Sequence, residues 1–257
     1  NRSLDTLYVR RDIDRDRRDE GSEPNPTVAT WHTSLPTAPK GFPAGASLDL
    51  TMDEASFLHD RIIGAHPRSL LAWLALHGQP SDVSFPWEHP DQADFGEDHR
   101  ELLLHARLFS DCMAGAAILY NVALADLARR EDTLERRREG FRSWWSTLDR
   151  AGIATWSMDR FWELTLDKGH NITRPTRRFV ESWVGMVRDQ GDELLDDPKA
   201  RSLVRSREMS LKRGRSRFAN RRALDQWGGA SGLGRYVYRW PTAQTFLNEL
   251  HTGLGRD

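Results

Sequence analysis

Apolar residues recur at helical spacing along most of the chain from residue 51 onward. Residues 51–65 carry such a stripe, and Thr51 is followed three positions later by Glu54, the signature of a helix capping box. The run 69–77 (SLLAWLALH) is apolar nearly all round and is followed by Gly78, which predicts a short buried helix. Residues 79–96 are predicted to form a proline-rich loop.

The longest predicted helix covers residues 97–130, where apolar side chains form a broad face. Small residues occupy its middle, from Ala114 to Ala117, with Gly115 among them. Glycine costs a helix roughly 1 kcal/mol relative to alanine, so we expect another helix to approach closely at this point.

Further helices are predicted toward the carboxyl terminus. They cover about 133–150 with Gly152 as the expected C-cap, 157–168, 175–190 with proline in the first turn, a helix that begins at 197–198, and 242–252. No segment apart from 236–240 (YVYRW) alternates with the period of a strand. The pattern predicts an all-α protein, an irregular bundle of seven to nine helices with little or no sheet.

Three regions follow from this pattern. Residues 1–46 are rich in charge and then in proline and glycine, which indicates an extended arm or linker. Residues 47–200 form the predicted helical core, and residues 201–257 a basic C-terminal segment with a glycine-rich loop, packed on that core. The chain begins at Asn1 rather than Met, so we expect a fragment or processed product, and the sequence leaves open whether an N-terminal domain is missing. The first twenty residues contain no apolar stretch, and we expect a cytoplasmic protein that does not contact membranes.

Charge is distributed unevenly along the chain. Residues 201–239, called the basic segment below, hold eleven Arg and Lys but only two acids, Glu208 and Asp225, a net charge of +9. Because the whole chain carries −1, the other residues carry −10. A basic cluster of this kind is typical of proteins that contact the phosphates of nucleic acids.

The run 213–222 (RGRSRFANRR) is the densest part of the basic segment. We expect five arginines in it to bind phosphate, namely Arg213, Arg215, Arg217, Arg221 and Arg222. Two alternatives stay open: neutralisation by acids of the same chain, for example Asp196 and Asp197, and docking to an acidic partner protein. Arginine is also favoured over lysine in GC-rich genomes, so the preference for arginine alone decides nothing.

Aromatic residues and glycines follow this run. Trp227 and Tyr236 are the candidates for stacking on bases. Residues 227–234 (WGGASGLG), the glycine-rich loop, could cradle an anion or form a tight turn that docks Trp227. The loop lacks the Lys-Ser/Thr pair of a phosphate-binding loop, and Ser231 is not in a GxSxG nucleophile elbow.

Other chemistry is weakly supported by the sequence. The nine histidines show no metal-ligand spacing, and we expect no metal or other cofactor and no catalytic residue. Asp111 and Glu101 could serve a metal-dependent nuclease only if carboxylates converged on one point. Asn121 is interpreted as a residue that satisfies a neighbouring helix end or contacts a ligand, and the single cysteine, Cys112, as a core residue.

Several stretches resemble one bacterial family. They are AGAAILYNVALA (114–125), TMDEASFLHDRI with SLLAWL, and above all ANRRALDQWGGASGLGRYVYRW (219–240). The chain is similar over most of its length to the domain of unknown function family numbered 6361. This family has no established activity, and its genes lie among helicases and nucleases in bacterial defence islands. The resemblance therefore implies an association with nucleic acid and a role in antiviral defence.

The leading functional hypothesis is a nucleic-acid-associated accessory protein that binds DNA in preference to RNA. We expect it to have no enzymatic activity, although the sequence leaves this open. The alternative is a protein-interaction subunit that docks a helicase or nuclease without touching nucleic acid.

Overall fold

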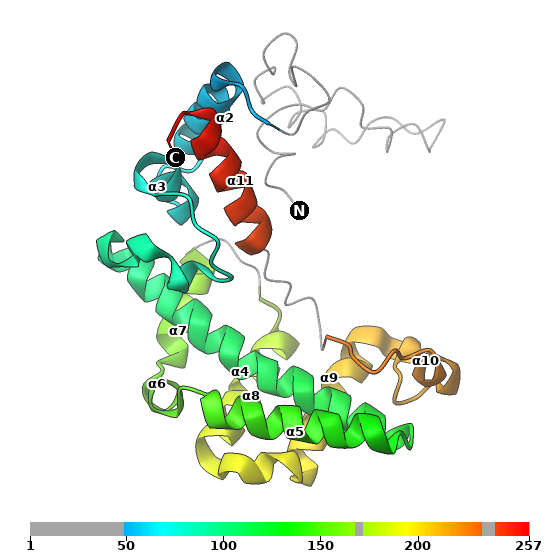
Figure 1. The fold of residues 1–257 in the computed structure, drawn as a ribbon. Coiled ribbons are helices and arrows are strands. Elements are labelled where there is room, and N and C mark those ends of the chain that lie inside the picture. The colour runs from blue at the N-terminus through cyan, green and yellow to red at the C-terminus, as the bar shows by residue number, and fades with distance from the viewer. Residues whose placement is uncertain (1–48, 168–171, 233–239, 257) are drawn as a thin grey trace, which may run out of the picture. The chain divides into compact units, whose positions relative to one another are not determined.

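The structure, a computed structural model, describes residues 49–167, 172–232 and 240–256. Within these ranges it contains ten α-helices, eight of them of seven residues or more, four short 3-10 helices and no strand (Figure 1). The all-α prediction is confirmed.

The described residues form two compact units. Residues 49–95 and 240–256 make unit 1, and the described residues between 96 and 232 make unit 2. The predicted border at 46 lies outside the described residues, and the predicted border at 200 falls inside a helix of unit 2. The last helix packs on the first two.

Unit 1 consists of α2 (Met52–Ala65), α3 (Leu70–His77), the 3-10 helices η2 (Pro86–Glu88) and η3 (Pro90–Asp94), and α11 (Trp240–Gly253). The capping box is present: the Thr51 amide donates to Glu54 Oε2 at 2.9 Å, and the Glu54 amide donates to Thr51 Oγ1 at 3.3 Å. Ser69 caps α3 through its side chain, and Gly78 ends that helix as predicted.

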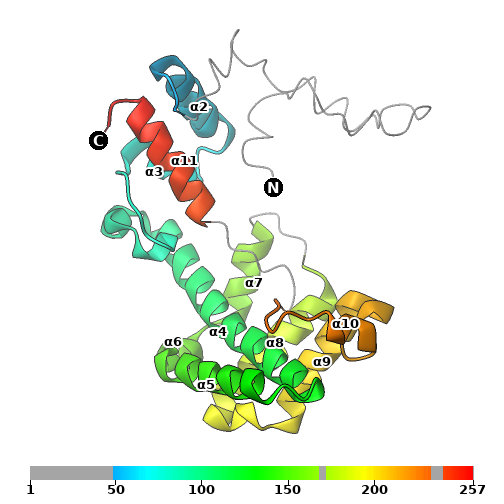
Figure 2. The same ribbon diagram turned by 45° about the vertical axis from the view of Figure 1, so that its right-hand side comes forward.

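Unit 2 is built around one long helix, α4 (Glu97–Leu127). It packs against α5 (Glu131–Thr147), α6 (Arg150–Thr155), α8 (Arg174–Gln190) and α9 (Pro198–Lys212). The remaining elements are α7 (Met158–Asp167), η4 (Gly191–Leu195), η5 (Arg213–Arg215) and α10 (Arg221–Asp225). α4 and α5 lie side by side in both views (Figures 1 and 2).

Gly152 is not the C-cap that the sequence predicted. α5 ends at Thr147, and Gly152 lies inside the short helix α6. The Asp149 side chain accepts a hydrogen bond from the Gly152 amide at 2.9 Å and so begins a new helix there.

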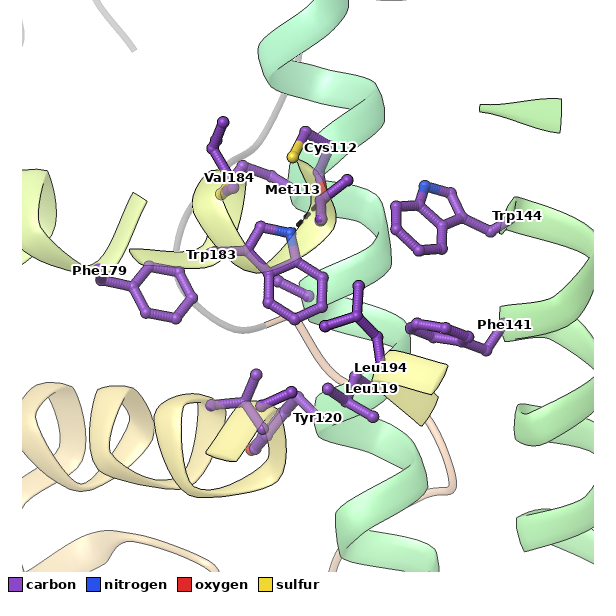
Figure 3. Close-up of a cluster of buried hydrophobic side chains, with 14 of the residues drawn as sticks. Cys112, Met113, Leu119, Tyr120, Phe141, Trp144, Phe179, Trp183, Val184 and Leu194 are labelled. Carbon is purple, nitrogen blue, oxygen red and sulfur yellow. Dashed lines mark hydrogen bonds between the residues drawn. The ribbon is translucent and has the colours of Figure 1, made fainter. Parts of the chain in front are cut away.

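The core of unit 2 surrounds the middle of α4. Trp144 reaches α4 from α5, and Trp183 reaches it from α8 (Figure 3). A Cβ placed on Gly115 would lie 2.2 Å from the Trp144 ring, so the glycine is what permits this contact. The expected close approach is confirmed, and so is the burial of Cys112.

By length and composition α4 could cross a membrane. However, 61% of its apolar window is buried inside the protein. A core helix has this property too, so α4 is weak evidence for membrane association.

Candidate nucleic-acid interface

The basic segment begins as α9, continues through η5 and α10, and ends in the glycine-rich loop. α9 presents two stripes at helical spacing. Pro198, Arg201, Ser202 and Arg205 line one hollow, whereas Leu203, Ser206, Arg207 and Ser210 line a separate groove. The helix thus directs cations to two different surfaces.

A buried carboxylate fixes the turn that follows α9. Glu208 is 2% exposed, and its Oε1 accepts hydrogen bonds from the Tyr120 hydroxyl at 2.8 Å and from the Arg217 amide at 3.2 Å. The Ser216 hydroxyl donates to Oε2. The Arg217 guanidinium in turn donates to the Tyr120 oxygen at 2.9 Å. We call these four residues, Tyr120, Glu208, Ser216 and Arg217, the buried polar cluster.

Burial is the main reason that the pKa of Tyr120 is raised, and its hydrogen bond to Glu208 adds to the shift. The phenol therefore stays protonated and serves as a donor. The cluster joins α4 to the basic segment and has a structural role.

Three arginines of the basic segment are neutralised within the molecule. Arg217 lies 3.7 Å from Glu208, and Arg221 lies 3.0 Å from Asp225. Arg201 pairs with Asp126 at 3.1 Å and with Asp196 at 3.2 Å. Arg217 and Arg221 were predicted to bind phosphate, and both already have a carboxylate partner.

Other cations of the segment remain available. Arg205, Lys212, Arg215 and Arg222 are exposed, and no ion pair joins them to the residues that the structure describes. Arg213 lies in η5, with a side chain outside the described part. Of the five predicted arginines, Arg215 and Arg222 are therefore the two that are exposed and have no carboxylate partner among the described residues.

Trp227 is not a stacking platform in this structure, contrary to the prediction. It is 2% exposed and belongs to the core of unit 2, with the Arg130 guanidinium 5.6 Å from its ring centre. An indole buried in this way offers no free face to a base. Tyr236, the other predicted aromatic, lies outside the described residues.

The glycine-rich loop is held down by hydrogen bonds to its carbonyl oxygens. Arg130 donates to the Trp227 carbonyl at 2.8 Å, and Arg137 donates to that of Gly229 at 3.0 Å. The Asn121 amide donates to the Ser231 carbonyl at 2.8 Å. Gly229 has a φ of +90°, which favours glycine. Of the two interpretations of this loop, the described part fits a turn that docks Trp227.

A hollow of about 560 Å³ lies between the end of α4 and the start of α9. Arg129, Arg201 and Arg205 line it, together with Asp126 and Phe218. The Arg205 guanidinium lies 5.8 Å from the centre of the half-buried Phe218 ring. This α4/α9 hollow combines arginines with an aromatic ring.

The acids considered for a metal site do not converge. Glu101 forms a bidentate pair with Arg160 through two contacts of 2.7 Å, and these hydrogen bonds lower the pKa of Glu101. Asp111 lies 3.6 Å from Arg107. No group of three or more potential metal ligands occurs among the described side chains.

The sequence analysis did not predict the role of Glu208 as the shared acceptor of the buried polar cluster. One signal could have found it, since Glu208 is one of only two acids among the 39 residues of the basic segment. An isolated acid in such surroundings is a natural partner for an arginine, but its pairing with Tyr120 depends on the fold.

These features define the class: an all-α protein of two compact units, the second of which exposes arginines beside an aromatic hollow. The chain belongs to the family of unknown function DUF6361, whose model matches residues 21–253. The resemblance noted in the sequence is thereby confirmed. Comparison with curated proteins and with solved structures gave no match.

Proposed function

We propose that the protein is a cytoplasmic, nucleic-acid-associated accessory protein that contacts phosphate through its basic segment. One observation carries the proposal: Arg205, Lys212, Arg215 and Arg222 are exposed and have no carboxylate partner in the described part of the chain. Release of counterions from phosphates would drive such binding without reference to base sequence.

The α4/α9 hollow supports the same function. Its volume of about 560 Å³ lies in the range of ligand pockets, roughly 300–1,000 Å³. Arg205 and Phe218 together offer a flat cationic and aromatic surface on which a base could stack. DNA in preference to RNA, a role in bacterial antiviral defence and the absence of catalysis are parts of this proposal.

Fluorescence anisotropy with single- and double-stranded DNA and RNA, over a range of salt concentrations, tests the proposal. The Arg215→Gln/Arg222→Gln variant should weaken binding and reduce the slope of log affinity against log salt by about 2, because each phosphate contact adds about one. The matched control is Arg142→Gln/Arg150→Gln, which changes the net charge equally on α5 and α6. Affinity that falls equally in both variants, or no binding at low salt, would refute the proposal.

A second candidate function is docking of a helicase or nuclease partner. It is favoured by Met209 and Leu211, which are 42% and 43% exposed on α9, the helix that also carries the exposed Arg205 and Lys212. Co-purification of a neighbouring helicase or nuclease that survives high salt, and that is lost in Met209→Ser/Leu211→Ser, would support this function over nucleic-acid contact.

A further inference from the structure

We propose that the groove between α8 and α9 is a binding site for a phosphoryl group. The groove has a volume of about 260 Å³ and is separate from the α4/α9 hollow, since it is lined by the other stripe of α9. Three arginines and three serines line it: Arg174, Arg178, Arg207, Ser182, Ser206 and Ser210. The proposal does not depend on nucleic-acid binding by the basic segment.

The groove is positively charged, because the described residues that line it include arginines but no carboxylate. None of its three arginines forms an ion pair with the described part of the molecule. Their neighbour Arg177 contrasts with them, because it pairs with Glu181 at 2.7 Å and lies over the Trp162 ring. The acids of this region thus neutralise the adjacent face of α8 and leave the groove cationic.

Arg207 is the side chain that most favours an anion in this groove. It is 8% exposed, its guanidinium lies 5.3 Å from the centre of the Phe179 ring, and one of its amino groups donates to Thr176 Oγ1 at 3.0 Å. Its Nε is buried and has no acceptor among the described residues. A buried guanidinium without a counter-charge is costly, and an anion in the groove would offset that cost.

The first turn of α8 adds to the effect. This turn contains no acidic residue. Instead, Arg174 occupies the first position of the helix, and Arg178 follows one turn later. Cations at a helix N-terminus oppose the helix dipole, whereas a bound anion is stabilised both by the dipole and by these arginines.

The donor set indicates a phosphoryl group in particular. Guanidinium groups match the geometry of phosphate oxygens through paired N–H donors, and serine hydroxyls supply further donors. Such a group can come from inorganic phosphate, from a nucleotide, or from the 5′ end of a nucleic-acid strand.

Isothermal titration calorimetry with inorganic phosphate, a nucleoside monophosphate, and oligonucleotides bearing either a 5′-phosphate or a 5′-hydroxyl tests this site. We expect one phosphate per chain, and at least tenfold weaker binding in Arg174→Gln/Arg178→Gln. Both of these side chains are exposed, so the variant should fold. Arg177→Gln, on the same helix, should bind within twofold of the natural protein.

The probes separate the sources of the phosphoryl group. Binding of inorganic phosphate and the nucleotide with equal affinity would identify a free phosphate site. A preference for the 5′-phosphorylated over the 5′-hydroxyl strand, lost in the double variant, would identify a strand end. Absence of phosphate binding at millimolar concentration, or equal loss in the Arg177→Gln control, would overturn the proposal.

The phosphoryl-group site and the proposed nucleic-acid binding by the basic segment can be refuted independently of each other. Arg174→Gln/Arg178→Gln should leave the salt-dependent binding of 5′-hydroxyl strands unchanged. Arg215→Gln/Arg222→Gln should leave the binding of inorganic phosphate unchanged.

Discussion

The Trp183 indole donates a hydrogen bond of 2.8 Å to the carbonyl oxygen of Cys112 and so joins α8 to α4 in the core of unit 2 (Figure 3). The thiol of Cys112 is fully buried beside this bond. Burial raises the pKa of that thiol to about 12, so almost no thiolate forms near neutral pH.

Cys112 should therefore be inert in the folded protein. The chain has no other cysteine, so a thiol reagent such as DTNB reports on this one group. We expect negligible reaction at pH 8 without denaturant and one thiol per chain in urea. Ser143→Cys, which places a second thiol at an exposed position of α5, is the positive control. Rapid reaction of Cys112 in the native protein would show that the core opens readily.

Gly115→Ala should destabilise unit 2 even though alanine is the better helix former. The new Cβ would lie 2.2 Å from the Trp144 ring, which its own hydrogen bond of 2.7 Å to the Asp111 carbonyl holds in place. Overpacking of this kind costs about 1–3 kcal/mol in the free energy of unfolding, measured by urea denaturation.

Gly185→Ala is the matched control for this substitution. Gly185 lies inside α8, and a Cβ there meets nothing within 4 Å. This variant should gain up to about 1 kcal/mol from helix propensity. Equal effects at the two positions would contradict the packing described around Trp144.

Removal of the Glu208 carboxylate should be costly. Glu208→Ala leaves Tyr120, Ser216 and Arg217 without their shared acceptor inside the protein. Loss of one partner from a buried ionic pair typically costs about 3–5 kcal/mol of unfolding free energy.

Tyr120→Phe tests the same cluster more gently. It removes one hydroxyl that donates to Glu208 and accepts from Arg217, and we expect a loss of about 2 kcal/mol, because hydrogen bonds to charged groups are worth more than neutral ones. A Glu208→Ala variant no less stable than Tyr120→Phe would show that the carboxylate does not hold the basic segment in place.

Acid should destabilise the protein through buried histidines. Burial is the main cause that lowers the pKa values of His89, His105 and His251. In the unfolded chain these histidines regain their ordinary pKa of about 6.5. The unfolded chain therefore binds protons more readily than the folded one. Stability should thus be full above pH 7 and fall as the pH drops through 6.5 toward 5, as followed by the urea midpoint.

His105→Gln should make this pH dependence weaker. The Trp156 indole donates to His105 Nδ1 at 2.8 Å, and the amide oxygen of glutamine can replace that acceptor without titrating. Stability that rises on acidification between pH 7 and 5 would contradict the assignment of these three histidines as neutral buried groups.

Local signals in the sequence were enough to predict much of the fold. The capping box at Thr51, the end of α3 at Gly78 and the apolar face of α4 depend on residues a few positions apart, and all three are present. Gly152 was misplaced because Asp149 begins a helix that the glycine alone does not reveal.

The candidate site was less predictable because it depends on long-range contacts. The hydrogen bond between Tyr120 and Glu208 joins residues 88 positions apart. Trp227 is contacted by Arg130, which lies 97 positions away in the sequence, and the groove arises only when α8 and α9 pack together. An arginine-rich run therefore indicated a charged surface but not which of its arginines are free.

The arrangement of unit 1 has a consequence for the order of events during synthesis. α11 packs on α2 and α3, yet it leaves the ribosome only after residues 96–238 have been made. Until α11 has been made, it cannot cover the apolar faces of α2 and α3. Exposed apolar surface of this kind makes a partly synthesised chain prone to aggregation. A chain that ended before residue 240 would contain every described helix of unit 2 but would lack the helix that packs on α2 and α3 in unit 1.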